Sequence, residues 1–243
     1  MNDGRPLGAR ALAEGLGTGL LVCAVVGSGI QAERLSPGEV GLQLLENSTA
    51  TALALVALIL CFGSVSGAHF NPAVTLAERL TSHIDTRTAG VYAAAQVLGG
   101  CAGTIAANIM FELSAIEPSS HDRMEPALLF AEVIATFGLL TVIFGVVRSH
   151  HPGAVSIAVA AYIGAAYWFT SSTSFANPAV TIARTLTDSF AGTAPASAPG
   201  FVAAQLIGAL LAVGGARLLF PQLERAPAPD SLPSLEEALD ARP

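Results

Sequence analysis

The residues best placed to do chemistry in this sequence are two asparagines in a repeated tripeptide. Asn71-Pro72-Ala73 and Asn177-Pro178-Ala179 each follow a run of small and polar residues, and each continues as Val-Thr. Asn is a preferred N-cap and Pro is favoured in the first helical turn, so each tripeptide predicts the start of a helix. An Asn amide at the positive end of a helix dipole offers hydrogen-bond donors to solute oxygen atoms.

The elements that must position these asparagines lie in a membrane. Apolar residues make up 52% of the chain and charged residues 12%, with a mean hydropathy of +0.60. The share of charged residues is about half of that in soluble domains, and the mean hydropathy is higher. Six apolar segments of about 17–24 residues are each long enough to cross the hydrocarbon as a helix. They are residues 7–30, 48–64, 90–111, 127–147, 154–171 and 199–220.

The helices that begin at the two tripeptides are too short to cross the membrane. Residues 71–81 and 177–187 give about ten residues each, whereas a spanning helix needs about 20. Non-helical backbone at membrane depth is tolerated only where protein buries it or where it lines a wet cavity. We therefore predict two re-entrant loops whose half-helices meet near the middle of the bilayer.

The two halves of the chain are repeats of one another. Glu14 in the first span corresponds to Glu132 in the fourth, and Gln96 in the third corresponds to Gln205 in the sixth. Three spans per half are an odd number, so the halves must have opposite orientations, and the half-helices enter from opposite faces. Two converging positive helix ends at the centre would favour neutral solutes and repel cations.

Glu14 and Glu132 are carboxylates inside predicted spans, where such groups usually have a function. One interpretation is that each accepts hydrogen bonds from the backbone N–H groups of a re-entrant loop. The other is that one of them relays protons in a secondary transporter. We favour the first interpretation, which the family resemblance described below also implies.

The basic residues predict the orientation in the membrane. All eleven are Arg, and cytoplasmic termini place eight inside and three outside, as the positive-inside rule expects. The inner set is Arg5, Arg10, Arg79, Arg87, Arg148, Arg217, Arg225 and Arg242; the outer set is Arg34, Arg123 and Arg184. The net charge of -7 argues against nucleic-acid binding. Residues 221–243 are rich in Pro, Ala and acidic residues and predict a disordered tail.

The sequence offers no support for an enzyme. It contains no grouping of nucleophile and base, no phosphate loop and no metal-ligand spacing, so we expect no cofactor and no bound metal. Cys23, Cys61 and Cys101 all lie in predicted spans, where they are expected to act as small apolar residues.

These features resemble the aquaporin, or major intrinsic protein, family. The likeness rests on the Ser66–Ala73 run, the second Asn-Pro-Ala, six spans in inverted halves and a Glu in the first span of each half. It implies an all-α membrane fold with six transmembrane helices and two half-helices in an inverted 3+3 repeat. The channel domain would cover residues 1–220, with repeats at about 7–111 and 127–220. A passive pore in each protomer of a homotetramer, in the cell membrane, is also implied.

The chain departs from the family at its narrowest point. Most members have Arg directly after the second Asn-Pro-Ala, whereas this chain has Val180. The other three positions of the family's selectivity filter fall on Thr51, Ala165 and Ser174, with Gly164 as the substitute if the register shifts by one. A filter of these residues is predicted to be wide, without an aromatic ring and without a fixed charge. It would admit neutral solutes larger than water.

Other residues are expected along the pore. The backbone of Gly67, Ala68, Ser172 and Thr173 would supply carbonyl acceptors. His69 is expected to line the cytoplasmic side, and the alternative is that it only packs against its neighbours. These predictions follow from the position of the loops before the two tripeptides.

Arg184 follows Val180 by four residues, hence lies on the same helix face. Two interpretations remain open for it. It could place a positive charge in the outer vestibule, or it could pair with Asp188.

The Val-for-Arg exchange is similar to that in bacterial aquaglyceroporins associated with arsenic resistance. The resemblance implies passage of water, glycerol and metalloids such as arsenite or methylated arsenicals. A water-selective aquaporin is the first alternative, and a proton-coupled secondary transporter is the second.

Overall fold

The chain folds into a bundle of long helices that encloses two short ones. The computed structural model describes residues 5–149 and 152–219; the predicted tail at 221–243 lies outside them. The long helices are α1 (Leu7–Leu35), α2 (Val40–Ser66), α4 (Thr86–Met110), α5 (Pro126–Arg148), α6 (Val155–Phe169) and α8 (Ala198–Leu219). The short ones are α3 (Pro72–Leu80) and α7 (Pro178–Ala183).

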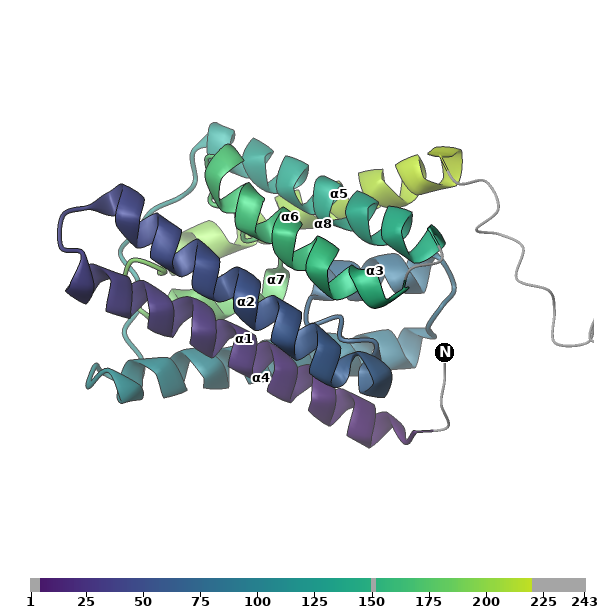
Figure 1. The fold of residues 1–243 in the computed structure, drawn as a ribbon, viewed down its shortest axis with the longest axis horizontal. Coiled ribbons are helices and arrows are strands. Elements are labelled where there is room, and N and C mark those ends of the chain that lie inside the picture. Colours follow the sequence, from purple (N-terminus) through teal and green to yellow (C-terminus); the bar gives the residue numbers. More distant parts are fainter. Residues whose placement is uncertain (1–4, 150–151, 220–243) are drawn as a thin grey trace, which may run out of the picture.

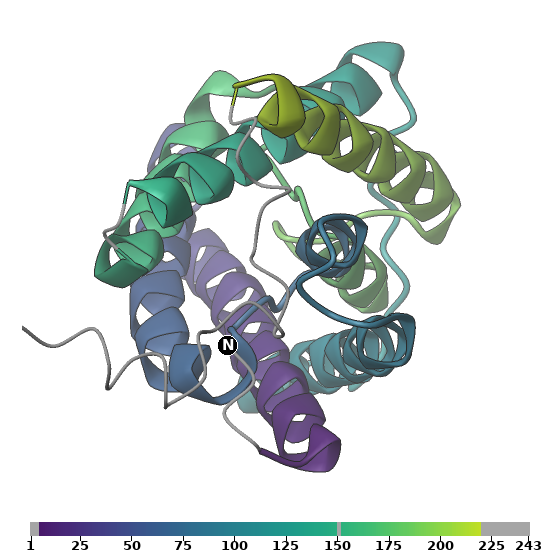
Figure 2. The same ribbon diagram turned by 90° about the vertical axis from the view of Figure 1, so that its right-hand side faces the viewer.

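The long helices run roughly along the long axis of the molecule (Figure 1). Viewed along that axis, they form a ring around the two short helices (Figure 2). Among the described residues, five helices are long and apolar enough to cross a membrane by themselves. Together with the shorter α6, they confirm the predicted all-α membrane fold with two re-entrant half-helices.

Helix α6 is shorter than the sequence predicted. It has 15 residues and follows the 3-10 turn Pro152–Ala154, whereas the apolar segment was expected to run to residue 171. The helix ends because Thr170 has an extended backbone, and its N–H closes the last turn on Ala166. The Ser/Thr-rich run after it therefore belongs to the re-entrant loop.

The second half-helix is also shorter than expected. Helix α7 ends at Ala183, and Arg184–Leu186 form a 3-10 turn. The carbonyl oxygen of Arg184 accepts a hydrogen bond from the N–H of Thr193 and so is not used to extend the helix.

The long helices of the two halves pack in the same arrangement. Helix α1 packs against α2 and α4, and its counterpart α5 packs against α6 and α8. The short helices touch both halves, since α3 contacts α4 and α8 while α7 contacts α4, α8 and α1. Each half-helix therefore packs against long helices of both halves.

Helices α1 and α4 approach closely because glycines face each other. A Cβ added to Gly99 would overlap the carbonyl oxygen of Gly15, and one added to Gly103 would overlap that of Gly19. On each helix the two glycines are four residues apart, which is the small-xxx-small spacing that lets membrane helices pack closely. Without such contact, helices in lipid lose the dispersion energy that holds them together.

We expect Gly103→Leu to destabilise the fold by about 1–3 kcal/mol or more, as overpacked cores are. The measurement is the thermal midpoint of the purified protein in detergent. Gly90→Leu is the matched control on the same helix, since a Cβ there meets nothing within 4 Å. Equal midpoints for the two variants would contradict the close packing of α1 and α4.

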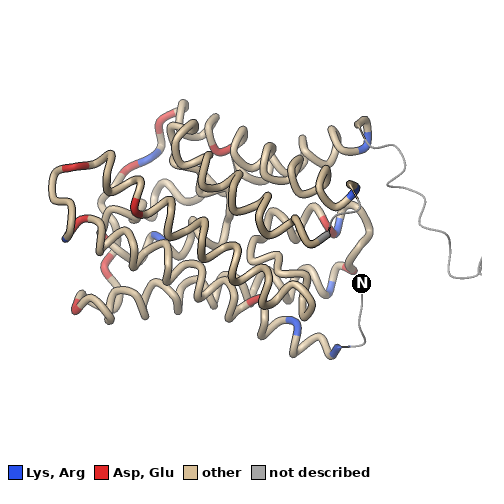
Figure 3. The backbone as a smooth tube through the Cα atoms, viewed as in Figure 1, with Lys and Arg blue, Asp and Glu red and all other residues tan. Residues whose placement is uncertain are grey.

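Charged residues are concentrated at the two ends of the bundle. Figure 3 shows most Arg residues at the end that carries the N-terminus, whereas the middle of the bundle holds few charged residues. This distribution is the one that a membrane protein needs, because charged groups in hydrocarbon are costly.

Candidate functional site

The two Asn-Pro-Ala segments meet inside the bundle and bind each other. The amide Nδ2 of Asn71 donates to the carbonyl oxygen of Ala176 at 2.7 Å, and that of Asn177 donates to Phe70 at 2.8 Å. The Oδ1 atom of Asn71 caps its own helix by accepting from the N–H of Ala73 at 2.9 Å. Each amide therefore links the two repeats with one N–H. Its second N–H is left for the cavity that both asparagines line.

The carboxylate of Glu14 binds the backbone of the first re-entrant loop. Its carboxylate accepts from the backbone N–H of His69 (3.0 Å) and of Phe70 (2.7 Å), from the hydroxyl of Ser66 (2.6 Å) and from the amide of Gln96 (2.8 Å). The side chain is fully buried and does not line the cavity. Loop N–H groups that no helix pairs are thereby satisfied.

Glu132 does the same for the second loop. It accepts from the backbone N–H of Phe175 (2.9 Å) and of Ala176 (2.8 Å), and from the amide of Gln205 (2.6 Å). It too is fully buried and absent from the cavity wall. Both carboxylates are thus occupied by the loop backbone and are shielded from the path of a solute.

The glutamines extend each network to the half-helix. The amide of Gln96 also donates to the hydroxyl of Thr75 at 3.0 Å, and that of Gln205 donates to Thr181 at 2.8 Å. These two threonines are the last residues of the two Asn-Pro-Ala-Val-Thr segments. Each half-helix is therefore fixed to the long helices by a buried polar chain, which explains why the segment is repeated beyond the tripeptide.

Both loops place non-glycine residues in left-handed backbone conformations. The φ angles are 50° at Ala68 and 49° at Phe70, and 52° at Ser174 and 47° at Ala176. The two pairs hold equivalent positions before the two asparagines. Such conformations cost about 1–3 kcal/mol each in non-glycine residues and persist only where the surroundings enforce them. Here the bonds to Glu14 and Glu132 are the enforcing contacts.

A continuous cavity of about 810 Å³ passes the two asparagines. One end is lined by His83 and Asp85 in the loop after α3, and the other by Tyr167 and Arg184. The predicted lining residues Gly67, Ala68, His69, Asn71 and Asn177 all face it, as do Val74 and Val180. Pro72, Ala73, Pro178 and Ala179 do not, and the two alanines are completely buried behind the asparagines.

The prediction that Ala165 belongs to the filter was wrong. Ala165 lies on the exposed face of α6, and the substitute Gly164 faces Ala52 of α2 at 3.3 Å from an added Cβ. The face of α6 that lines the cavity carries Val159, Ile163 and Tyr167, at helical spacing. Counting back from Asn177 fails because the count crosses a loop that is not helical.

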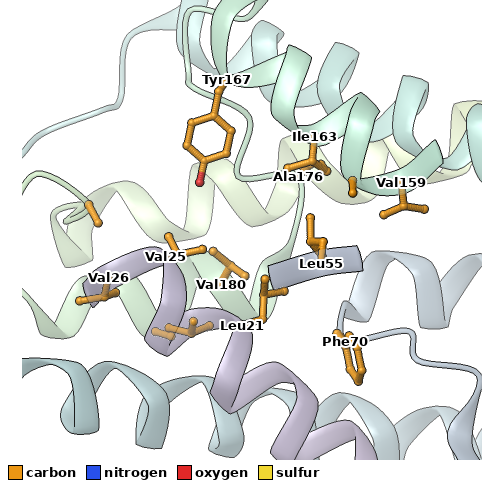
Figure 4. Packing of buried hydrophobic residues seen from close by; sticks show 14 of the residues in the cluster. Leu21, Val25, Val26, Leu55, Phe70, Val159, Ile163, Tyr167, Ala176 and Val180 are labelled. Atoms are coloured by element: carbon orange, nitrogen blue, oxygen red, sulfur yellow. The ribbon is translucent and has the colours of Figure 1, made fainter. Parts of the chain in front are cut away.

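Tyr167 takes the position that Ala165 was expected to hold. Figure 4 shows its side chain pointing from α6 toward Val25 and Val180. Its hydroxyl lies 3.2 Å from the hydroxyl of Thr51 on α2, so either can donate to the other. The set that lines this end is therefore Thr51, Tyr167, Ser174 and Val180, and it contains an aromatic ring that the sequence did not predict.

Two further lining predictions were wrong. Ser172 and Thr173 do not line the cavity, and Ser172 is fully buried. The hydroxyl of Ser172 accepts from the N–H of Ser174 at 3.2 Å. The left-handed backbone at Thr173 and Ser174 turns the chain, so only Ser174 faces the cavity.

Arg184 lies in the cavity wall and not in an ion pair with Asp188. Its Nε donates to the carbonyl oxygen of Ala191, and its guanidinium carbon lies 3.5 Å from the centre of the Phe175 ring. Asp188 instead accepts from the backbone N–H of Ser120 at 2.9 Å. The pairing interpretation is therefore excluded, and Arg184 is 3% exposed.

At the opposite end, His69 and His83 sit near the mouth of the cavity. The ring of His69 contacts the hydroxyl of Thr75 at 3.1 Å and packs edge-on against Tyr92. His83 lies 2.9 Å from the carboxylate of Glu78. That hydrogen bond raises the pKa of His83 above its ordinary value.

The raised pKa of His83 has a testable consequence. Because the folded state binds the proton more tightly, the contact stabilises the protein at pH values below the unfolded pKa and is lost as pH rises through the folded one. We expect an NMR titration of His83 to show a pKa that falls in Glu78→Gln. Glu39→Gln, an exposed residue at the far end of the bundle, should leave it unchanged. A His83 pKa that is the same in both variants would contradict the pairing.

Sequence reasoning missed some residues that build this site. Tyr167 and Phe175 were not selected, although an aromatic side chain four residues after Ile163 was a usable signal. Gln96 and Gln205 were noticed as repeat partners but were given no role. Their buried amides on membrane helices could have indicated a polar network.

Comparison with known proteins agrees with this architecture. The profile of the family described as "Major intrinsic protein" matches residues 6–174. The chain is 48% identical over 210 residues to "Aquaglyceroporin AqpS" of Rhizobium meliloti (strain 1021), covering 86% of this chain and 89% of the relative. It is 32% identical to "Probable aquaporin NIP7-1" of Arabidopsis thaliana, over 51% of this chain and 45% of the plant protein.

A solved structure shares the fold. The X-ray structure of the aquaglyceroporin from Plasmodium falciparum superposes with a TM-score of 0.68 at 22% identity, covering 90% of this chain and 99% of the other. The chain therefore belongs to the major intrinsic protein family, whose members are membrane channels and not enzymes.

Proposed function

We propose that the protein is a passive channel for water and for small uncharged solutes such as glycerol, urea and metalloid hydroxides, arsenite and methylated arsenicals included. The observation that carries the proposal is Val180. It faces the cavity directly after the second Asn-Pro-Ala, so the strong donor of most family members is absent at that point. A relative with 48% identity is called an aquaglyceroporin, which supports a solute range beyond water.

The buried carboxylates support a passive channel over a coupled transporter. A coupling carboxylate must exchange a proton with the transport path, whereas Glu14 and Glu132 are fully buried, lie off the cavity and are bonded to loop backbone. We propose that their role is to support the loops. The amides of Asn71 and Asn177, with the two positive helix ends, would orient solute oxygens and repel cations at the centre.

We also propose a homotetramer in the cell membrane with both termini in the cytoplasm. The support for the orientation is the gathering of Arg at the end that carries the N-terminus (Figure 3). In this orientation, His83 lies at the cytoplasmic mouth and Arg184 lies toward the outer mouth.

A water-selective pore is the second candidate, and Tyr167 favours it. An aromatic side chain bonded to Thr51 reduces the space beside Val180, which the sequence alone did not suggest. Apolar Val180 offers no donor that would orient a polyol, yet it also leaves more room than Arg would.

Stopped-flow light scattering of proteoliposomes under gradients of water, glycerol, urea and arsenite distinguishes the candidates. The proposal expects flow of water and of the larger solutes, with no accumulation against a gradient. Water flow without flow of glycerol or arsenite would overturn the wide-pore proposal. Uphill accumulation that an uncoupler abolishes would overturn the passive one.

A further inference from the structure

Two arginines lie against one aromatic ring at the outer end of the cavity. The guanidinium carbon of Arg184 is 3.5 Å from the centre of Phe175, and that of Arg123, from the segment before α5, is 5.2 Å from it. Arg184 lines the cavity, whereas Arg123 lies behind the ring and reaches the carbonyl oxygen of Ser172 at 3.5 Å. The two positive charges are thus held together by a shared contact.

No carboxylate of the described residues forms an ion pair with either arginine, although Glu132 is close enough to interact with both electrostatically. Neither arginine forms an ion pair within 4.0 Å among residues 5–149 and 152–219. Three acidic groups lie in the same part of the molecule and are engaged elsewhere. Glu132 is bonded to the loop backbone, Asp188 to Ser120, and Asp122 to Ser197.

Arg184 also has hydrogen-bond donors that no described residue uses. Within the described part of the chain only its Nε donates a hydrogen bond, to the carbonyl oxygen of Ala191, so the terminal N–H groups have no acceptor among these residues. The side chain is 3% exposed, and the small exposed part faces the cavity. A buried guanidinium without a directly bonded counter-charge is costly, and an anionic oxygen ligand would reduce that cost.

The neighbouring groups define the chemistry of such a ligand. The hydroxyl of Tyr167 lines the same end and can donate to an oxygen acceptor, while Thr51 holds it in place. The opposite wall is apolar, with Val25, Leu21 and Val180. The space therefore suits a small molecule with a compact apolar part and a group of acidic oxygens.

We infer that Arg184, with Tyr167 and backed by Arg123, forms a binding site for the acidic oxygen group of a small monoanionic oxyacid at the outer end of the pore. The inference rests on the proposed channel function and specifies one site within it. Compared with family members that have Arg at the position of Val180, this chain then carries the positive charge one helical turn further outward, at Arg184, and has not lost it.

The test uses the full chain and methanesulfonate, a compact oxyacid that stays a monoanion. Osmotic water flow into proteoliposomes is the readout, because it does not depend on which larger solutes pass. Methanesulfonate replaces chloride at constant ionic strength, and dimethyl sulfone serves as the neutral molecule of similar shape. We expect methanesulfonate to slow water flow saturably and the sulfone to have no effect.

Variants assign the effect to the site. In Arg184→Gln the half-inhibiting concentration should rise about tenfold or more, as expected for the loss of a charge-assisted hydrogen bond. Tyr167→Phe should give a smaller rise, and Arg184→Lys should keep part of the inhibition. Arg87→Gln, an exposed arginine at the start of α4, is the matched control and should behave as the wild type.

A second readout tests the proposed binding site separately from the proposed channel function. Saturation-transfer NMR on the methyl signal of methanesulfonate reports binding to purified protein without any flow. If water does not flow but binding is present and is lost in Arg184→Gln, the channel function fails and the site stands. If the wild type shows neither inhibition nor binding, or if the sulfone acts equally, the site is overturned.

Discussion

Replacing Glu132 by Leu is expected to abolish solute flow by unfolding the second re-entrant loop. The carboxylate is the only acceptor that the described residues offer to the backbone N–H groups of Phe175 and Ala176, and it also binds Gln205. Each buried donor left without a partner costs about 1–3 kcal/mol, so the loss is several times the effect of one hydrogen bond. Ala176, held at a φ of 47°, would be released from its strained conformation.

The measurement is the yield and thermal midpoint of purified protein, followed by water flow in proteoliposomes. Glu132→Gln should be intermediate, since its amide oxygen can still accept but its NH₂ faces another donor at Gln205. Glu125→Leu at the start of α5 is the matched control, because Glu125 is exposed and caps nothing with its side chain. A Glu132→Leu protein with normal stability and flow would show that the loop does not depend on the carboxylate.

The fold could be predicted from the sequence because its signals are local or repeated. The helix starts at Asn71 and Asn177 follow from capping chemistry, and both side chains do cap their helices. The apolar segments follow from hydropathy, and the inverted arrangement follows from an odd number of spans per half. The contacts of Glu14 and Glu132 with the loops could be expected because unpaired loop N–H groups in a membrane need acceptors.

The outer end of the cavity could not be predicted because it depends on how irregular backbone orients neighbouring helices. Ala165 was selected by counting along the chain, but the rotation of α6 about its axis brings Tyr167 inward. Likewise, the step from α-helix to 3-10 turn at Arg184 carries that side chain onto Phe175. Neither rotation nor helix type is encoded in residue spacing alone.

This correction changes what the Val180 exchange means. With Ala165 in the filter, the ring would have been wide and without charge. With Tyr167 in the place of Ala165 and Arg184 one helical turn away, the residues that line this end of the cavity are partly polar and partly apolar. The polar ones lie on one side. We therefore expect the selectivity of the pore to depend on the space beside Val180 as much as on the missing donor.

Val180→Arg is expected to keep part of the water flow and to lose flow of glycerol, urea and arsenite. The side chain of Val180 lies in the first turn of α7 and faces the cavity beside Tyr167, so a guanidinium there fills the space that a larger solute needs. Water can still pass in single file by accepting hydrogen bonds from the new donors. We expect glycerol flow to fall about tenfold or more, which corresponds to a barrier increase of about 1.4 kcal/mol or more.

The control is Val180→Leu, which adds one methylene without a donor or charge and should slow glycerol far less than Arg does. The new arginine also lies four residues from the buried Arg184, so repulsion between the two charges is expected to lower the stability of the variant. The thermal midpoint of the purified variant is therefore measured before the flows are compared. Because the variant leaves Tyr167 and Arg184 in place, undiminished glycerol flow would mean that these two residues, and not the space beside position 180, set the upper size of the solute.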